Sequence, residues 1–255
     1  FATVRAGVDT LESYSMELDA NYGASDRAAF RVNGYYQSLD SHRDFYDGDS
    51  FAINPTVRLA LSEATTLNLS YEYVDDDRTV DRGVPSVRRA NGRGEPLKGF
   101  EDTFFGSPDA NVTTLEAHIV SARLEHDFSD WLTGNATLQY ADYDKVYQNL
   151  YPSDSVALAN GTLPEVELDG YRDPTERENL IVQANLVGEF ETGPLGHVLL
   201  FGFEFGDHRC RPDAPRWNRR SSRLVRAADR TRPRRSLCRR ARRGHRASGS
   251  FGQHR

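Results

Sequence analysis

Three consecutive carboxylates are the first feature of this chain with the composition of an ion-binding site. Asp75, Asp76 and Asp77 follow one another directly, and clustered carboxylates suit hard cations such as Ca²⁺. The same run is also typical of a solvated loop start, because Arg78 and Arg82 follow closely enough to neutralise it. The residues alone leave both interpretations open.

A second group of charges is basic and glycine-rich. It contains Arg88, Arg89, Arg93 and Lys98, with Gly92, Gly94 and Gly99 between them. A positive loop of this kind attracts an anionic ligand electrostatically. The alternative is a mobile surface loop without a ligand.

No enzyme motif accompanies these charges. The chain has no G-x-S-x-G, no H-E-x-x-H and no phosphate-binding loop. Glu125 and His126 are neighbours, but successive side chains of a strand point to opposite faces, so these two cannot act as a dyad. The histidines His42, His118, His126 and His197 are scattered without metal-ligand spacing. We therefore expect no enzymatic activity, no protein-bound metal and no cofactor.

The elements that carry these residues repeat one pattern, in which apolar and polar side chains alternate. Strict alternation predicts a strand with one apolar and one polar face. We expect strands near residues 2–8, 12–22, 27–38, 51–61, 65–74, 113–127, 132–147, 176–190 and 197–206. Many segments run for about 10 residues, the length that a tilted strand needs to cross a bilayer. Strands of globular proteins usually have about 5–6 residues.

The alternation also predicts which side chains face lipid and which face a lumen. Those expected to face lipid are Leu18, Val32, Leu69, Leu124, Leu138 and Leu186. Their neighbours Asp19, Asn33, Ser70, Arg123, Gln139 and Asn185 are expected to face the lumen. A mean hydropathy of −0.66 agrees with this arrangement, because a barrel places apolar residues only at every second position.

The connections between the predicted strands alternate in length. Short links rich in turn-forming residues span Gly23–Asp26, Ser62–Ala64, Ser129–Trp131 and Glu191–Gly196. Long links on the other side span Asp40–Ser50, Asp75–Val112 and Gln148–Thr175, and the short link Asp9–Leu11 also falls on this side. Transmembrane barrels have short periplasmic turns and long extracellular loops. The sequence therefore predicts an all-β fold, an antiparallel transmembrane β-barrel portion, with a soluble all-β domain as the alternative.

The last part of the chain has a different composition. Residues 208–255 hold 17 Arg, no Lys and 2 Asp, a net charge of +15, whereas residues 1–207 carry −21. One interpretation is a basic tail that binds nucleic acid or anionic lipid. The other, which we favour, is an out-of-frame translation of a GC-rich gene, since alternation stops abruptly and Lys is absent. We expect 1–207 to be the barrel unit and 208–255 to be a disordered tail that binds no nucleic acid.

Several short stretches resemble the TonB-dependent siderophore receptors. The run Glu72-Tyr-Val-Asp-Asp-Asp-Arg-Thr-Val-Asp-Arg-Gly-Val-Pro85 is similar to a segment of that family. Further matches are Thr103–Asn111, Tyr143–Asn149 and His197–Gly206, preceded by Arg43-Asp-Phe45 and Asn54-Pro55. The resemblance extends over residues 1–207, and the motifs occur in order.

The resemblance implies a barrel of about 22 strands, the size of plugged outer-membrane transporters, of which this chain holds about nine. It implies import of Fe(III)–siderophore complexes across the outer membrane of a Gram-negative bacterium, with energy relayed through TonB. Siderophore contacts are expected from Arg82, Arg88, Arg89, Tyr147 and Tyr151. The iron arrives inside its chelator, so neither a metal site nor a cofactor is required.

The resemblance also implies that parts of a receptor are not in this sequence, among them the plug domain that contacts TonB. We therefore expect a fragment that is non-functional alone, because unpaired strand edges in lipid are costly. The alternative function is a passive porin-like or adhesin-like barrel of the outer membrane.

Overall fold

The computed structural model describes residues 1–88, 92–153, 165–211 and 223–226, and every regular element among them is a strand. The strands are β1 (Ala2–Val8), β2 (Tyr14–Ser25), β3 (Ala28–Leu39), β4 (Gly48–Ala60), β5 (Thr65–Thr79), β6 (Ser86–Arg88), β7 (Gly94–Pro96), β8 (Val112–Ser129), β9 (Leu132–Pro152), β10 (Glu165–Thr192), β11 (Leu195–Arg211) and β12 (Arg223–Arg226). No helix in the described part of the chain is long and apolar enough to cross a membrane.

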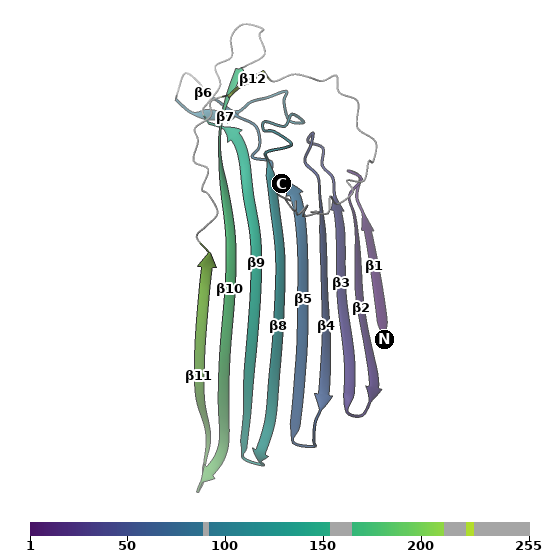
Figure 1. Ribbon diagram of the computed structural model, residues 1–255, viewed down its shortest axis with the longest axis vertical. Coiled ribbons are helices and arrows are strands. Elements are labelled where there is room, and N and C mark those ends of the chain that lie inside the picture. Colours follow the sequence, from purple (N-terminus) through teal and green to yellow (C-terminus); the bar gives the residue numbers. More distant parts are fainter. Residues whose placement is uncertain (89–91, 154–164, 212–222, 227–255) are drawn as a thin grey trace, which may run out of the picture.

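One antiparallel sheet contains most of these strands. Its order is β1-β2-β3-β4-β5-β8-β9-β10-β11, so strands adjacent in the sheet follow one another along the chain apart from the small β6–β7 hairpin. The sheet is long and curved, with its tight turns at one end and its longer connections at the other (Figure 1). Residues 26–27, 61–64, 130–131 and 193–194 make the tight turns, and residues 40–47, 80–111 and 153–164 make the long links. The predicted alternation of connection length is confirmed.

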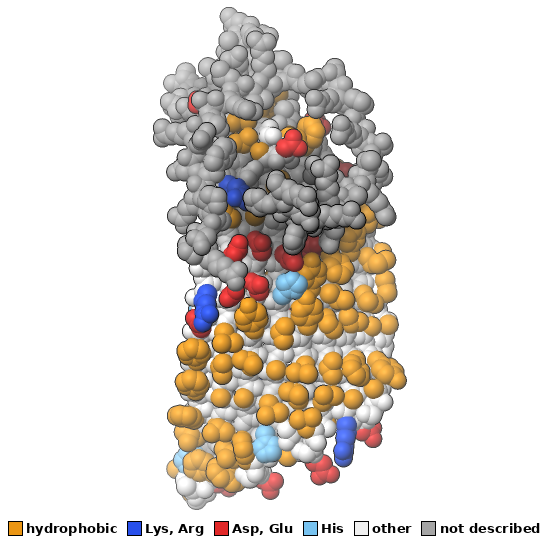
Figure 2. Space-filling view, viewed as in Figure 1, with side chains coloured by type: hydrophobic (Ala, Val, Ile, Leu, Met, Phe, Trp, Pro, Cys, Tyr) orange, Lys and Arg blue, Asp and Glu red, His pale blue; other side chains and the backbone are white. Residues whose placement is uncertain are grey.

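The pairing register places apolar side chains of neighbouring strands in rows on one face. One row runs across the sheet through Tyr22, Phe30, Val57, Leu69, Ala122, Leu138, Val182 and Phe205. A row on the opposite face contains Arg58, Asn68, Arg123, Thr137, Gln183 and Glu204. Figure 2 shows the apolar face as a broad band, with charged side chains gathered above and below it. Such a sheet matches the wall of a transmembrane barrel, apolar toward lipid and polar toward the lumen.

Three strands extend beyond this apolar band. We expected β9 to end near residue 147 and β10 to begin near residue 176, but their pairing continues to Pro152 and Leu168. The expected loop Gln148–Thr175 is therefore wrong in its bounds, and only residues 153–164 connect the two strands. Likewise, β5 continues through the three aspartates to Thr79. Above the lipid both faces are in contact with water or loops, so the apolar–polar alternation fades while the backbone pairing continues.

A small hydrophobic core lies at this upper end of the sheet. Its buried members are Val87, Leu97, Phe105, Val166 and Leu168, and Val84, Phe100 and Leu150 pack against them. The loop between β5 and β8 supplies most of the cluster, and the tops of β9 and β10 supply the rest. The loop is thus packed onto the sheet that it follows.

Part of the predicted tail forms strand. β11 continues to Arg211, four residues past the expected boundary, and β12 pairs with Glu165–Leu168 of β10. The disorder expected for 208–255 is therefore not seen in these two segments. The other residues of the tail, 212–222 and 227–255, lie outside the described residues.

Candidate functional site

Arg82 lies in the loop after β5 and reaches across to β9 and β10. Its Nη1 donates hydrogen bonds to Tyr147 Oη at 3.3 Å and to Tyr171 Oη at 3.4 Å. Its Cζ lies 5.2 Å from the ring centroid of Tyr151, at cation–π distance. We call these four residues the Arg82–tyrosine cluster. The structure thus brings together three of the residues expected to contact siderophore.

Strand geometry explains how the three tyrosines meet. Tyr147 and Tyr151 are four residues apart on β9, so they share a face. Tyr171 of β10 pairs with Asn149, which lies between them. The ring centroid of Tyr171 is 5.8 Å from that of Tyr147 and 6.3 Å from that of Tyr151. Side chains alternate between the two faces along β9 and β10, so the three tyrosines lie on the polar face of the sheet, the face that Gln139 also occupies.

The residues on either side of Arg82, Asp81 and Gly83, constrain the turn that carries it. Asp81 forms an ion pair with Arg43 in which both side chains are largely buried. Asp81 Oδ1 also accepts a hydrogen bond from the Gly83 N–H at 2.9 Å. Gly83 has a φ of 82°, a left-handed conformation that side chains with a Cβ rarely adopt. The backbone around Arg82 is therefore constrained, although the side chain itself is exposed.

The electrostatics of the cluster favour an anionic ligand. The Arg82 guanidinium is charged at any physiological pH, and the hydrogen bonds to Tyr147 and then to Tyr171 raise its pKa further. Three phenol rings surround this cation and add flat apolar faces and hydroxyl groups. The arrangement can bind an anion that carries aromatic or polar groups, and it contains no activated nucleophile.

Asn149 adds an unusual polar group beneath the cluster. The residue is 1% exposed, and no described group lies within hydrogen-bonding distance of its Oδ1 or Nδ2. A buried polar group without a partner costs about 1–3 kcal/mol. Unsatisfied buried polar groups are rare in native structures, and a functional role is one explanation for them.

Two other residues expected at the site cannot be placed with the cluster. Arg88 ends β6, where it pairs with Gly94 through the backbone, but its side chain lies outside the described part of the structure. Arg89 also lies outside the described residues. Both remain predictions.

The three aspartates do not converge on a cation. Because β5 includes them, Asp76 faces the lumen side while Asp75 and Asp77 face the opposite side. Asp76 forms an ion pair with Arg78 at 2.9 Å and accepts a hydrogen bond from Ser50, and Asp75 and Asp77 also interact with neighbours. Among the described residues, no three His, Cys, Asp or Glu side chains are placed to hold a metal ion.

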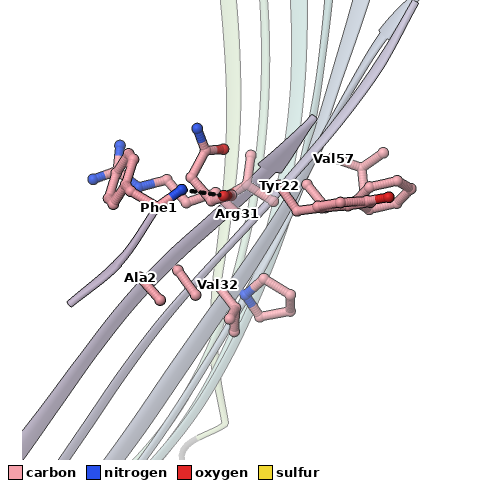
Figure 3. Close-up of a pocket in the computed structure, with 11 residues that line it drawn as sticks. Phe1, Ala2, Tyr22, Arg31, Val32 and Val57 are labelled. Carbon is pink, nitrogen blue, oxygen red and sulfur yellow. Dashed lines mark hydrogen bonds between the residues drawn. The ribbon is translucent and has the colours of Figure 1, made fainter. Parts of the chain in front are cut away.

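A groove of about 520 Å³ lies over the lower part of β1–β4 (Figure 3). Ala2, Tyr22, Val32 and Val57 line it from the apolar face, and the amino group of Phe1 donates to Asn21 O at 3.0 Å beside it. Its lining is mainly apolar and belongs to the membrane-facing band. The groove lacks the converging polar groups that fix a ligand's orientation.

Tyr171 and Asn149 were missed as site residues by sequence reasoning. Tyr171 fell inside the loop expected over Gln148–Thr175, where no face can be assigned. An alternating pattern in the sequence could have predicted a strand there. Val166, Leu168 and Gly170 alternate with Glu167, Asp169 and Tyr171. Tyr147, Asn149 and Tyr151 likewise continue the period of two that begins in the apolar part of β9.

Comparisons with known proteins give relatives of a single kind, although no family model matches the chain. It is 27% identical over 209 residues to the probable TonB-dependent siderophore receptor PiuA of Acinetobacter baumannii, covering 81% of this chain and 28% of the relative. It is 27% identical over 206 residues to the catecholate siderophore receptor Fiu of Escherichia coli K12, covering 74% of this chain and 27% of the relative. The metal-pseudopaline receptor CntO of Pseudomonas aeruginosa PAO1 is 27% identical over 209 residues, with 80% of this chain and 28% of the relative covered.

Solved structures agree with these relatives. The crystal structure of PiuA from Acinetobacter baumannii matches with a TM-score of 0.69 at 26% identity, covering 82% of this chain and 30% of that one. The ferripyoverdine receptor of the outer membrane of Pseudomonas aeruginosa matches with a TM-score of 0.69 at 18% identity, covering 82% of this chain and 28% of that one, which shows the fold alone.

These similarities confirm the resemblance to TonB-dependent siderophore receptors and the fold expected from it. The chain has the antiparallel sheet of an outer-membrane receptor barrel, and its place is the outer membrane of a Gram-negative bacterium. It spans about 28% of the length of the curated relatives it matches.

Proposed function

We propose that this chain, whose relatives are TonB-dependent siderophore receptors, serves in the uptake of ferric siderophores energised through TonB. The observation that carries the proposal is the Arg82–tyrosine cluster. It lies on the polar face of the sheet, on the side of the long connections. A ligand that enters the lumen from outside the cell would meet it before it reached the membrane-spanning part of the strands.

The chemistry of the cluster supports this ligand class. A ferric chelate with anionic oxygen donors is attracted by the Arg82 cation, and its flat groups can stack on the tyrosine rings. Arg88 and Arg89 are proposed to attract the same ligand. The protein needs no side-chain ligand for iron, because the siderophore already surrounds it. Iron is therefore cargo in this proposal, and no enzymatic step is involved.

The proposal is tested by exchanging loops with a relative. Residues 75–112 and 148–175 of this chain replace the matching segments of the full-length PiuA receptor from Acinetobacter baumannii, and growth is measured on a panel of ferric siderophores. We expect the chimera to change which ferric siderophore supports growth, because loops carry selectivity on a fixed scaffold. A matched chimera that exchanges only the tight turns at 23–26 and 62–64 should keep the specificity of its host. If the loop chimera reaches the membrane and also keeps the host specificity, the proposal is wrong.

A further inference from the structure

Asn111, the residue directly before β8, uses the whole hydrogen-bonding capacity of its side chain. It is 0% exposed. Its Nδ2 donates to Val80 O at 2.8 Å and to Leu150 O at 2.9 Å. Its Oδ1 accepts from Ser107 N–H at 3.1 Å and from Leu150 N–H at 3.0 Å. A carboxamide has two donors and two acceptor positions, so all four are occupied.

These bonds join three segments that are far apart in the chain. Val80 begins the loop after β5, Ser107 lies near the end of the same loop, and Leu150 belongs to β9. The Val80 N–H also donates to the backbone oxygen of Asn111 at 3.0 Å. Asn111 therefore fixes both ends of the loop to the strand that carries the tyrosines.

Two of these segments carry members of the Arg82–tyrosine cluster. Val80 lies two residues before Arg82, and Leu150 lies between Asn149 and Tyr151 in β9. We infer that Asn111 is the positioning residue of the Arg82–tyrosine cluster: its carboxamide holds the guanidinium opposite the tyrosines.

The space around Asn111 is matched to this role. A Cβ atom on Gly106 would lie 2.7 Å from Asn111 Nδ2 and 2.9 Å from its Cγ, closer than side-chain contacts allow. The carboxamide cannot retreat, because four hydrogen bonds hold it. Gly106 therefore has to lack a side chain for Asn111 to bind in this geometry.

The test begins with Asn111→Asp, which changes hydrogen bonding at nearly constant shape. When ionised, aspartate can accept from Ser107 and Leu150 but cannot donate to the oxygens of Val80 and Leu150. Burial beside these oxygens raises the pKa of such a carboxyl. Above that pKa the ionised carboxylate of the variant repels both oxygens, and below it the neutral acid donates its single O–H to one of them. The loop should therefore be loosened at pH 8 and largely held at pH 5.

Two measurements on the full chain in detergent micelles read out this change. Hydrogen–deuterium exchange of the amides at 80–84 and 149–151 should be about 10-fold faster than in the unaltered chain at pH 8, and within roughly 2-fold of it at pH 5. Affinity for the ferric complex of 2,3-dihydroxybenzoate should fall about 10-fold at pH 8 and recover at pH 5, each relative to the unaltered chain at the same pH.

Asn185→Asp is the matched control. Asn185 is likewise an asparagine whose amide donates a hydrogen bond, to Asn135 Oδ1 at 3.1 Å, but it lies in β10, far along the strand from the loop. It should change neither measurement at either pH. If Asn111→Asp does not fold, as shown by loss of the β-sheet signal in circular dichroism, Gly106→Ala is used in its place. The added methyl group of Gly106→Ala displaces the same carboxamide without adding a charge. Gly106→Ala should speed amide exchange at 80–84 at both pH values.

Amide exchange tests the positioning role of Asn111 by itself, whereas the affinity measurement also rests on the proposed function. The two measurements therefore separate this inference from that function. Faster, pH-reversible exchange without any binding of the ferric complex by the unaltered chain would support the positioning role and count against the proposed ligand class. Binding by the unaltered chain that neither Asn111→Asp nor Gly106→Ala alters would overturn the positioning role. Unchanged exchange in both variants would overturn it as well.

Discussion

Arg82 Nη1 donates to Tyr147 Oη over 3.3 Å and so joins two residues that are 65 positions apart in the chain. The bond links the loop after β5 to a strand two places further along the sheet. It exists because β9 continues past the apolar band and carries Tyr147 up to the level of the loop. Loop and strand together, and neither alone, form the candidate site.

The first prediction concerns the shape of the cation. Arg82→Lys keeps the positive charge but loses the planar guanidinium, whose Nη1 donates to both hydroxyls and whose Cζ lies over the Tyr151 ring. We expect the affinity of the full chain for the ferric complex of 2,3-dihydroxybenzoate to fall roughly 10-fold. Quenching of protein fluorescence during titration measures this affinity.

The control for this prediction is Arg123→Lys. Arg123 also faces the lumen and pairs with Glu125 at 2.9 Å, so the substitution makes the same chemical change outside the cluster. Its affinity should match that of the unaltered chain. Equal losses in the two variants would mean that overall charge, and not the cluster, governs binding.

The second prediction concerns the side-chain amide of Asn149, which has no hydrogen-bond partner among the described residues. Leucine has the same number and branching of side-chain heavy atoms as asparagine but no polar group to bury. Asn149→Leu should therefore raise the free energy of unfolding by about 1–3 kcal/mol. Urea unfolding in detergent micelles measures the difference.

Asn111→Leu is the matched comparison, because Asn111 is also fully buried and all of its polar groups are paired. It should lower the free energy of unfolding, since it leaves backbone groups of Val80 and Leu150 without partners. Destabilisation by Asn149→Leu as well would show that Asn149 has a hydrogen-bond partner in solution.

The sheet was predictable from the sequence because lipid and lumen impose opposite polarity on alternate residues. Leu69, Leu138 and Leu186 could be assigned to one face before their register was known. Strand ends above the membrane were not predictable in the same way. Tyr147 and Tyr151 could be named only through the resemblance, and Tyr171 was missed, because polarity no longer alternates where water reaches both faces. The bond of Asn111 to Leu150 depends on how the loop folds back, which no local pattern encodes.

The third prediction concerns pH and the connection between β1 and β2. Asp9 Oδ1 accepts hydrogen bonds from the N–H groups of Leu11 at 2.8 Å and Ser13 at 3.1 Å. These bonds, that from Leu11 foremost, lower the pKa of the Asp9 carboxyl below its ordinary value. A lowered pKa means that the stabilisation is present above the unfolded value of about 3.9 and is lost as the pH falls through the folded value.

Amide exchange at Leu11 and Ser13 should therefore speed up, relative to the amides of β2, as the pH is lowered below about 4. Asp9→Asn is the control, because its amide oxygen still accepts but does not titrate in this range. The relative exchange in that variant should stay constant with pH. An equal pH response in both chains would assign the change to another group.

The fourth prediction concerns the two faces of β5. Leu69 lies in the apolar row that crosses the sheet, and Ser70 beside it points to the lumen. A cation on the lipid side near the middle of the bilayer costs about 2–4 kcal/mol, whereas lumen substitutions cost little. Leu69→Arg should therefore lower the free energy of unfolding in lipid by about that amount, and Ser70→Arg should leave it nearly unchanged.

The pair is its own control, because the two positions are adjacent in the same strand and receive the same side chain. Spin labels at the two positions give an independent measurement. A label at residue 69 should be reached by oxygen dissolved in the bilayer, and a label at residue 70 by a water-soluble nickel complex. The pleat of the strand alone separates these environments. Equal accessibility at both positions, or equal destabilisation by both arginines, would mean that this sheet does not divide lipid from a lumen.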